Sequence, residues 1–335
     1  MANRVPQPTD DQLLRRSGRI YSRFGLQHHV YGVPVDWRVL RQKEHERIEE
    51  LHRTLRDLFQ GQVVLPPFPP ATNDSNSNGA PKVLDCGCGQ GAWIDGLIDD
   101  CSGECDGTGI DIYLGRAVDD DEDPEEDEDQ PDAVQEWERK RWNLNARFSE
   151  DPRRHGLGPE SFHLINSRLL AEGINASRWP SYVHDLCLML KRGNGWLQMI
   201  EIEPRVQSWN GRLRMDSCLT RWWEWYVSTM TTMRKNPRIG QELRRLLEHE
   251  GLADVRGQPI DLPIGDWATG RTSIETDAVE KMLKSLSLYP FLHVGGMAEN
   301  TYLQLMAGAI RELRTPDLKL YLKVHYAYGR RRRAG

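Results

Sequence analysis

The sequence predicts an α/β fold of the Rossmann-like type, in which helices cover a mostly parallel seven-stranded sheet. Three observations support this prediction. From Lys82 onward, short apolar runs alternate with amphipathic stretches, as in parallel strands joined by helical crossovers. A glycine-rich turn follows the first of these runs. The length of 335 residues suits one such domain with substantial additions.

The chain before this alternating pattern is expected to divide into three pieces. Residues 1–19 are polar and predict a loose arm. Residues 37–59 predict a helix, because their apolar residues recur along one stripe. Residues 61–80 are rich in Pro and then in Asn, Ser and Gly, which is typical of a linker. The organisation is therefore an N-terminal arm and helix over 1–60, this linker, and a main domain over 81–335.

Within the main domain, strand and helix patterns can be assigned in order. The expected strands cover residues 82–86, 107–113, 145–151, 162–170, 195–203, 253–265 and 319–329. The expected helices cover residues 91–100, 133–144, 179–191, 216–233, 237–250, 275–288 and 297–314. The last two helices make up a helical insertion before the last strand, over about residues 265–315.

One segment of the main domain is strongly acidic. Residues 119–132 hold eleven acidic side chains and no basic one, and removing them from a net charge of −6 leaves +5 for the rest of the chain. Such a run repels itself and contributes little apolar surface to a core. The prediction is a disordered, solvated loop, and the alternative is a docking segment for a basic partner.

Composition argues against several classes of protein. There is no run of eighteen apolar residues and no apolar N-terminal stretch, so neither a membrane span nor a secretory signal is expected. Cys101 and Cys105 could be metal ligands, but no second pair follows at zinc spacing, so no metal is predicted. The absence of a regular cysteine framework favours the cytoplasm, with a nuclear location as the alternative. No basic face with interleaved aromatic residues suggests nucleic acid as a partner.

The most informative motif covers residues 83–92, where a strand leads through a glycine turn into a helix. The turn contains Gly87, Cys88, Gly89 and Gly91. Glycines allow a sharp turn and let a ligand approach the backbone closely. Taken alone, this spacing also fits a dinucleotide-binding loop, and a glycine turn without any ligand is a third interpretation.

Two acidic residues at strand ends narrow the choice of ligand. Asp85 lies two residues before the first glycine, where a carboxylate would repel the pyrophosphate of a dinucleotide. It would instead attract the ammonium and sulfonium groups of S-adenosyl-L-methionine. Asp111, followed by Ile112, ends the second strand, where a carboxylate can accept hydrogen bonds from ribose hydroxyls. These positions favour S-adenosyl-L-methionine as cofactor over the dinucleotide of an oxidoreductase.

Two further stretches are assigned to the same site. Glu150 or Asp151 follows the expected third strand, where an acid could bind the adenine amino group. Asn166, Ser167 and Arg168 end the expected fourth strand, which faces the ligand crevice in such sheets. Each stretch fits an ordinary polar loop equally well.

Several segments outside the glycine motif are typical of one family. They cover residues 31–36 with Leu40 and His45, then 162–168, 195–201 and 263–267, the last reading Pro-Ile-Gly-Asp-Trp. Together with residues 83–91 they resemble the LaeA-like methyltransferases of filamentous fungi, almost from end to end. The chain departs from that family in its acidic insertion, in Asn166, where His is more common, and in His163, where Asp is more common.

The resemblance implies a class I methyltransferase fold, whose last strand is antiparallel, and S-adenosyl-L-methionine as cofactor. It also implies that Tyr31 lies near this cofactor. The family includes biosynthetic enzymes as well as regulators, so it supports the cofactor more strongly than the reaction.

The acceptor side is expected to come from the additions to the sheet, residues 1–60 and 265–315. Candidate substrate-binding residues are Tyr21, Trp222, Trp223, Tyr226 and Trp267. Aromatic residues at helical spacing more often belong to a core. A general base would help if the acceptor must lose a proton, and the candidate catalytic residues are His28, His29 and His293. A lone histidine is more often structural.

The sequence therefore predicts an S-adenosyl-L-methionine-dependent methyltransferase that acts on a small molecule, in particular a fungal secondary metabolite. The alternative is a LaeA-like regulatory or scaffold protein that binds the same cofactor but acts through protein partners. The acceptor atom stays open between O, N, C and S, and the oligomeric state is left open.

Overall fold

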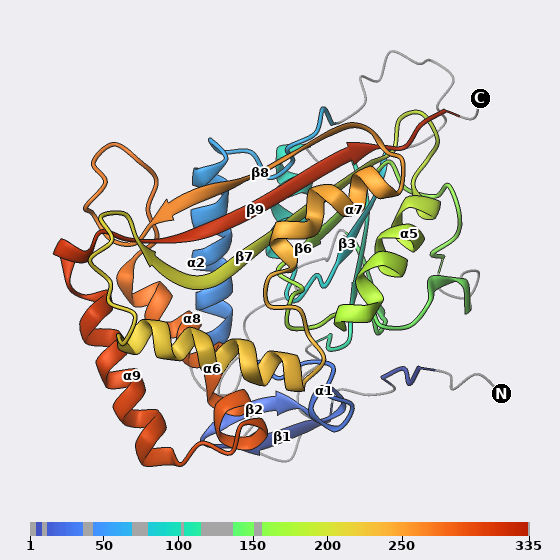
Figure 1. The fold of residues 1–335 in the computed structure, drawn as a ribbon. Helices are drawn as coiled ribbons and strands as arrows, with labels where there is room; N and C mark the ends of the chain where they lie inside the picture. Colours follow the sequence, from blue (N-terminus) through green and yellow to red (C-terminus); the bar gives the residue numbers. More distant parts are fainter. Residues whose placement is uncertain are drawn as a thin grey trace, which may run out of the picture.

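The molecule is built around one seven-stranded sheet (Figure 1). The computed structural model describes residues 5–8, 12–35, 43–68, 80–101, 104–114, 137–150 and 156–333. The strands, in their order across the sheet, are β5 (Glu138–Arg141), β4 (Asp106–Asp111), β3 (Lys82–Cys86), β6 (Leu164–Arg168), β7 (Trp196–Ser208), β9 (Leu320–Arg330) and β8 (Ala253–Pro263). All neighbours are parallel except β9, which is antiparallel to both β7 and β8. The predicted Rossmann-like sheet with an antiparallel last strand is confirmed.

The central strands are buried because helices cover both faces of the sheet. Val83 and Leu84 in β3 and Ile165 in β6 have no exposed surface, as expected for apolar strands inside a parallel sheet. The helices that flank the sheet are α2 (Lys43–Leu58) and α3 (Ala92–Asp100) on one face, and α5 (Trp179–Met189) and α7 (Leu243–His249) on the other (Figure 1). The carboxyl ends of β3, β4 and β6 are thereby left free to form a site.

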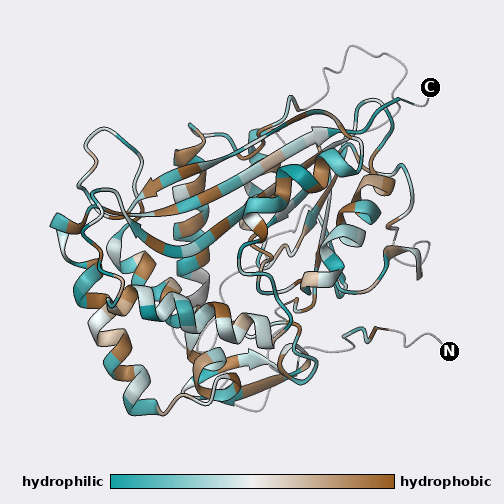
Figure 2. Ribbon diagram, in the orientation of Figure 1, coloured by the Kyte–Doolittle hydropathy of each residue, from teal (hydrophilic) through white to brown (hydrophobic). Residues whose placement is uncertain are grey.

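A second group of helices packs below the sheet in the view of Figure 1. It consists of α6 (Cys218–Thr232), α8 (Thr276–Tyr289) and α9 (Glu299–Leu313). Figure 2 shows hydrophobic and hydrophilic residues alternating along α6 and α9, so each helix buries one side. These helices share an apolar core with α2, β7 and β9. The helices α8 and α9 form the helical stretch expected between the last two strands.

The N-terminal residues form a small layer of their own. They comprise β1 (Leu13–Arg16), β2 (Arg19–Ser22) and α1 (Arg23–Gln27). The prediction of a loose arm over residues 1–19 is wrong for the described part, because β1 and β2 pair as an antiparallel hairpin. Ser17 and Gly18, both at positive φ, close its two-residue turn. The helix expected over 37–59 is observed as α2, and residues 36–42 lie outside the described residues.

The region after β4 also differs from the prediction. The helix expected over 133–144 is wrong in its described part, since Glu138–Arg141 is the edge strand β5 and pairs with β4. The strand expected over 145–151 is wrong as well, because Phe148–Glu150 is a 3-10 turn. An edge strand needs backbone pairing on one side only, so its charged sequence, ERKR, carries no apolar signature.

The remaining short elements join the larger ones. They are the 3-10 turns Ala176–Arg178, Ile239–Glu242 and Pro316–Leu318, and the π-helical turn Pro290–Val294. The second of these replaces the first part of the helix expected over 237–250. No helix of the described ranges combines the length and apolarity needed to cross a membrane. The acidic segment 119–132 lies outside the described residues, so its disorder stays a prediction.

Candidate functional site

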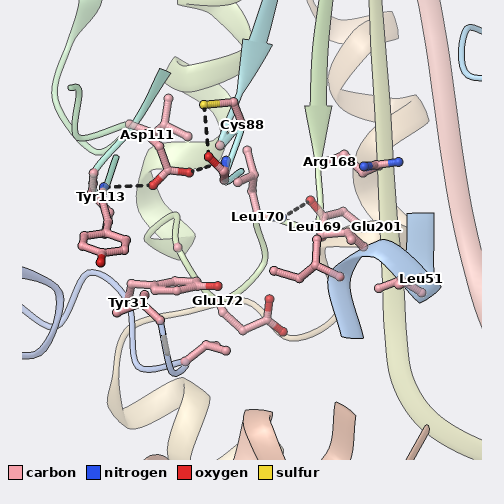
Figure 3. A pocket seen from close by; sticks show the side chains of 18 of the residues that line it. Tyr31, Leu51, Cys88, Asp111, Tyr113, Arg168, Leu169, Leu170, Glu172 and Glu201 are labelled. Atoms are coloured by element: carbon pink, nitrogen blue, oxygen red, sulfur yellow. Dashed lines mark hydrogen bonds between the residues drawn. The ribbon is translucent and has the colours of Figure 1, made fainter. Parts of the chain in front are cut away.

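A deep cavity opens at the carboxyl ends of β3, β4 and β6 (Figure 3). The glycine turn and the strand ends form one wall. Residues of the N-terminal segment, from Val30 to Leu51, and of α8 form the other walls. The empty space is about 1320 Å³, with the open solvent at its mouth included.

The glycine turn is held against β4 by backbone hydrogen bonds. The amides of Gly87 and Cys88 donate to the carbonyl of Ile110 at 2.8 and 3.2 Å. Gly87 has φ of +71°, and a Cβ atom there would lie 2.3 Å from Cδ2 of Leu170, so glycine is favoured at this position. A Cβ at Gly89 would meet nothing within 4 Å. The backbone at Gly89 is therefore open to a ligand in the cavity.

Asp111 fastens the same turn from the end of β4. Its Oδ2 accepts a hydrogen bond from the amide of Gly89 at 3.0 Å, and its Oδ1 accepts one from the amide of Tyr113 at 3.1 Å (Figure 3). Burial raises the pKa of Asp111, and these two amides lower it. The carboxylate is half-buried and lines the cavity, so it can still accept hydrogen bonds from a ligand.

Asp85 lines the cavity and has an exposed fraction of 2%. Its Oδ1 accepts a hydrogen bond from Nδ2 of Asn166 at 2.8 Å. Burial raises the pKa of Asp85 to about 7, against the opposing effects of this hydrogen bond and of the Arg168 charge. Asn166 is fully buried and does not line the cavity. Asn166 therefore orients Asp85. Gln198 in turn donates a hydrogen bond to Oδ1 of Asn166 at 3.1 Å.

Arg168 brings a positive charge to the cavity from the end of β6. Both terminal nitrogens of its guanidinium lie 3.2 Å from Nδ1 of His52 in α2, and must donate to it. Burial lowers the pKa of Arg168 to about 10. Burial and the neighbouring Arg168 lower the pKa of His52 to about 4. His52 is thus a neutral acceptor that fixes the guanidinium.

Two glutamates line the part of the cavity beyond the end of β6. Glu201 of β7 accepts hydrogen bonds from the amides of Leu170 at 2.8 Å and Ala171 at 3.2 Å. Burial raises its pKa to about 8. Glu172 accepts a hydrogen bond from the hydroxyl of Tyr226 at 2.5 Å. Burial raises the pKa of Glu172, against this hydrogen bond and the charge of Arg47.

The structure brings most of the predicted cofactor residues together. Those that line the cavity are Tyr31, Asp85, Gly87, Cys88, Gly89, Asp111, Ile112 and Arg168. Gly91 instead begins α3 at φ of +103°, and Ser167 is buried and accepts a hydrogen bond from Tyr182. The side chain of Glu150 and all of Asp151 lie outside the described residues.

The predicted substrate and catalytic residues do not line the cavity. Four of the aromatic side chains are buried in the core, namely Tyr21, Trp222, Trp223 and Tyr226. Trp267 donates to the carbonyl of Leu320 at 2.7 Å. His28 and His29 are exposed, and Nε2 of His293 lies 3.1 Å from Oγ of Ser17. Of these residues only Tyr226 reaches the site, through Glu172.

Sequence reasoning missed several residues of the cavity. They are Arg47, Tyr113, Trp142, Glu172 and Glu201. A signal existed for Glu201, because an acidic residue interrupts the apolar run of its strand, and buried acids are rare unless they have partners. Glu172 lies four residues beyond β6 with no comparable signal.

The strand order and the glycine turn after β3 define a class I methyltransferase fold. No family model matches the chain. The chain is 24% identical over 339 residues to the secondary metabolism regulator LAE1 of Cochliobolus heterostrophus, with 98% of each chain covered. It is 23% identical over 255 residues to that of Gibberella fujikuroi, covering 73% of this chain and 74% of the relative. These matches confirm the resemblance to the LaeA-like proteins.

Solved structures align with the chain at lower similarity. A cyclopropane-fatty-acyl-phospholipid synthase-like protein from Lactobacillus casei aligns with a TM-score of 0.45 and 11% identity, covering 91% of this chain and 98% of that one. Phosphoethanolamine N-methyltransferase 2 of Haemonchus contortus, in complex with S-adenosyl-L-methionine, aligns with a TM-score of 0.42 and 13% identity. This alignment covers 85% of the present chain and 53% of the Haemonchus chain, about half its length.

Proposed function

We propose that the cavity binds S-adenosyl-L-methionine. The observation that carries the proposal is the meeting of Asp85, the open glycine turn and Asp111 in one cavity. Asp85 would attract the ammonium group of the cofactor, and Asp111 would accept hydrogen bonds from its ribose hydroxyls. Arg168, fixed by His52, would pair with its carboxylate. The room above Gly89 supports this fit.

We further propose that the protein transfers a methyl group to a small molecule, in particular a fungal secondary metabolite. When bound, the cofactor supplies a methyl carbon already activated by the sulfonium. The protein's own part is to hold an acceptor beside it and to exclude water. The N-terminal segment and α8 would hold the acceptor, since Val33, Leu51 and Met282 give the cavity an apolar wall. Residues 1–60 and 265–315 are thus assigned to the acceptor side.

A second candidate function follows from the curated relatives, which are called regulators of secondary metabolism. In this alternative, the protein binds the same cofactor and acts through protein partners. The apolar wall of Val33, Leu51 and Met282 favours the enzyme, because a regulator that only binds the cofactor needs no apolar surface for an acceptor.

Calorimetry with purified protein tests the cofactor. We expect S-adenosyl-L-methionine and S-adenosylhomocysteine to bind and NAD not to bind. Binding of NAD alone would refute the proposal.

Mass spectrometry of a fungal extract, incubated with the protein and a cofactor bearing a deuterated methyl group, then separates the two functions. A labelled small molecule supports the enzyme, and label found only on protein or nowhere supports the regulator.

A further inference from the structure

Four carboxylates line the cavity, and three of them are engaged in holding the protein itself. Asp85 is paired with Asn166. Asp111 and Glu201 each accept two backbone amides, one on each oxygen. Glu172, like Asp85, accepts a single side-chain hydrogen bond, from the hydroxyl of Tyr226 to Oε1, but it is not assigned to the cofactor. A carboxylate offers about four acceptor positions, so Glu172 keeps capacity for a ligand.

The position of Glu172 is fixed from two sides. Glu201 accepts hydrogen bonds from the amides of Leu170 and Ala171, the two residues directly before Glu172. Tyr226, whose ring stacks on Trp222 at 5.1 Å between centroids, holds its Oε1. Figure 3 shows Glu172 on the side of the cavity away from Cys88. The carboxylate is thus aimed into the compartment beyond the proposed cofactor site.

The surroundings of Glu172 define what it could bind. Apolar side chains of the N-terminal segment and α8 line the cavity, among them Val33, Leu51 and Leu286. No histidine of the described residues lines it. Glu172 is half-buried between this apolar wall and the charges of Arg47 and Lys235, and a partly desolvated carboxylate gains from a ligand that donates a hydrogen bond. The matching ligand is an apolar molecule with an O–H or N–H group.

We propose that Glu172 is a catalytic residue that binds the methyl acceptor through an O–H or N–H group and takes its proton, with Tyr226 as its positioning residue. The inference rests on the proposed function. In the step, the acceptor oxygen or nitrogen forms a bond to the methyl carbon while the carbon–sulfur bond breaks. The electron pair of that bond goes to sulfur, which yields S-adenosylhomocysteine, and the proton goes to the carboxylate of Glu172.

Equilibrium capture gives a test that does not depend on turnover. Protein loaded with S-adenosylhomocysteine is incubated with a fungal metabolite extract, and retained compounds are identified by mass spectrometry. We expect wild type and the control Glu299→Gln, an exposed residue of α9, to retain the same compound. Glu172→Gln should lose at least about tenfold of it. Calorimetry should show cofactor affinity within about threefold of wild type for all variants, since Glu172 lies on the acceptor side.

Turnover of the captured compound gives the second test. Glu172→Gln should slow methyl transfer by about 10²- to 10⁴-fold, the usual contribution of a general base. The wild-type rate should fall as the pH drops and Glu172 takes up a proton. Because the Tyr226 hydrogen bond lowers the pKa of Glu172, Tyr226→Phe should move this decline to higher pH. Fragment masses of the labelled product show whether oxygen or nitrogen received the methyl group.

The outcomes separate the two proposals. A wild-type protein without affinity for S-adenosyl-L-methionine refutes the proposed function. A wild type that binds the cofactor but captures and methylates nothing supports the regulator, and it overturns both the proposed methyl transfer and the inference. A wild type that methylates a small molecule, with folded Glu172→Gln doing so equally well, overturns the inference alone. The inference also fails if folded Glu172→Gln keeps capture, rate and pH profile, or if Tyr226→Phe leaves the profile in place.

Discussion

Asp85 and Asp111 both reach the cavity, but their carboxylates differ in what holds them. Each carboxylate oxygen of Asp111 accepts one hydrogen bond from a backbone amide. Asp85 meets a single side-chain amide and is almost completely buried. The two residues therefore respond differently to pH and to substitution.

Asp85→Asn should remove a pH dependence of cofactor binding. Burial raises the pKa of Asp85 to about 7, so wild-type affinity for the cationic cofactor should increase between pH 6 and pH 8. The variant should bind about tenfold more weakly at pH 8, or about 1.4 kcal/mol, with a shallower pH dependence. Calorimetry at three pH values measures both effects. An unchanged slope in the variant would remove Asp85 from the site.

The ligand-free protein supplies the control for this variant. The folded-state pKa of Asp85 lies above its unfolded value of 3.8. The folded state thus binds the proton more tightly, and stability falls as the pH rises from about 4 to about 7. In Asp85→Asn this part of the decline should disappear, which denaturant titrations at several pH values would show.

Asp111→Ala should weaken cofactor binding and loosen the glycine turn together. Charge-assisted hydrogen bonds of about 1.5–3 kcal/mol correspond to a loss of roughly ten- to a hundredfold in affinity. The melting temperature should also fall, because the amides of Gly89 and Tyr113 lose their acceptor. Asp111→Asn, which keeps one acceptor oxygen, should be milder in both measurements. An alanine variant with lower stability but unchanged affinity would make Asp111 purely structural.

How far the site could be predicted depended on where each residue lies in the chain. Asp85 and Asp111 end strands beside a glycine turn, so topology alone predicted that they meet. Glu172 and Arg47 reach the cavity from a loop and from the N-terminal helix, and no local pattern encodes their approach. The catalytic histidines were predicted from residue type alone, which does not show whether their side chains point into the cavity.

At the scale of elements, Gln198 ties three segments together. Its Oε1 accepts a hydrogen bond from the amide of Leu65 at 2.7 Å. Its Nε2 donates to the carbonyl of Val63 and to Oδ1 of Asn166, both at 3.1 Å. The first part of the linker, at Val63 and Leu65, is thereby fixed to the sheet. The same side chain also supports Asn166, which orients Asp85.

Gln198→Met should test this junction, because it keeps the side-chain volume and removes all three hydrogen bonds. Leaving buried polar groups without partners costs about 1–3 kcal/mol each, so we expect a loss of about 3 kcal/mol in the free energy of unfolding. Cofactor affinity should fall as Asn166 loses its support. The matched control Gln304→Met, on an exposed face of α9, should change neither. Equal stability of the two variants would contradict the assignment.

Among the elements, too, some could be predicted from the sequence and others could not. The apolar strands β3, β6 and β7 were predicted because burial on both faces leaves an uninterrupted hydrophobic run. The edge strand β5 was missed because only its backbone pairs with β4. The N-terminal hairpin was missed because its strands have only four residues each.

At the scale of the whole molecule, charge is distributed unevenly along the chain. Eleven of the 50 acidic residues fall in residues 119–132. Deleting this segment should leave the fold and the affinity for the cofactor intact, because no apolar residue except proline is present to join a core. Melting temperature and calorimetry of the deletion variant measure both. A loss of several kcal/mol of stability would show that the segment is packed.

The hydrogen bonds of Lys235 extend the connection between the N-terminal segment and the sheet. Its Nζ donates to the carbonyls of Val30 at 3.1 Å and Gly173 at 2.9 Å, joining the N-terminal segment to the loop after β6. We therefore expect the parts of the chain before and after the linker to unfold cooperatively, although the linker separates them in sequence. Heating should produce a single calorimetric transition, with equal calorimetric and van't Hoff enthalpies. Residues 1–80 and 81–335 would then melt as one thermodynamic unit, and a cut at residue 80 would leave two fragments that each lack part of their core.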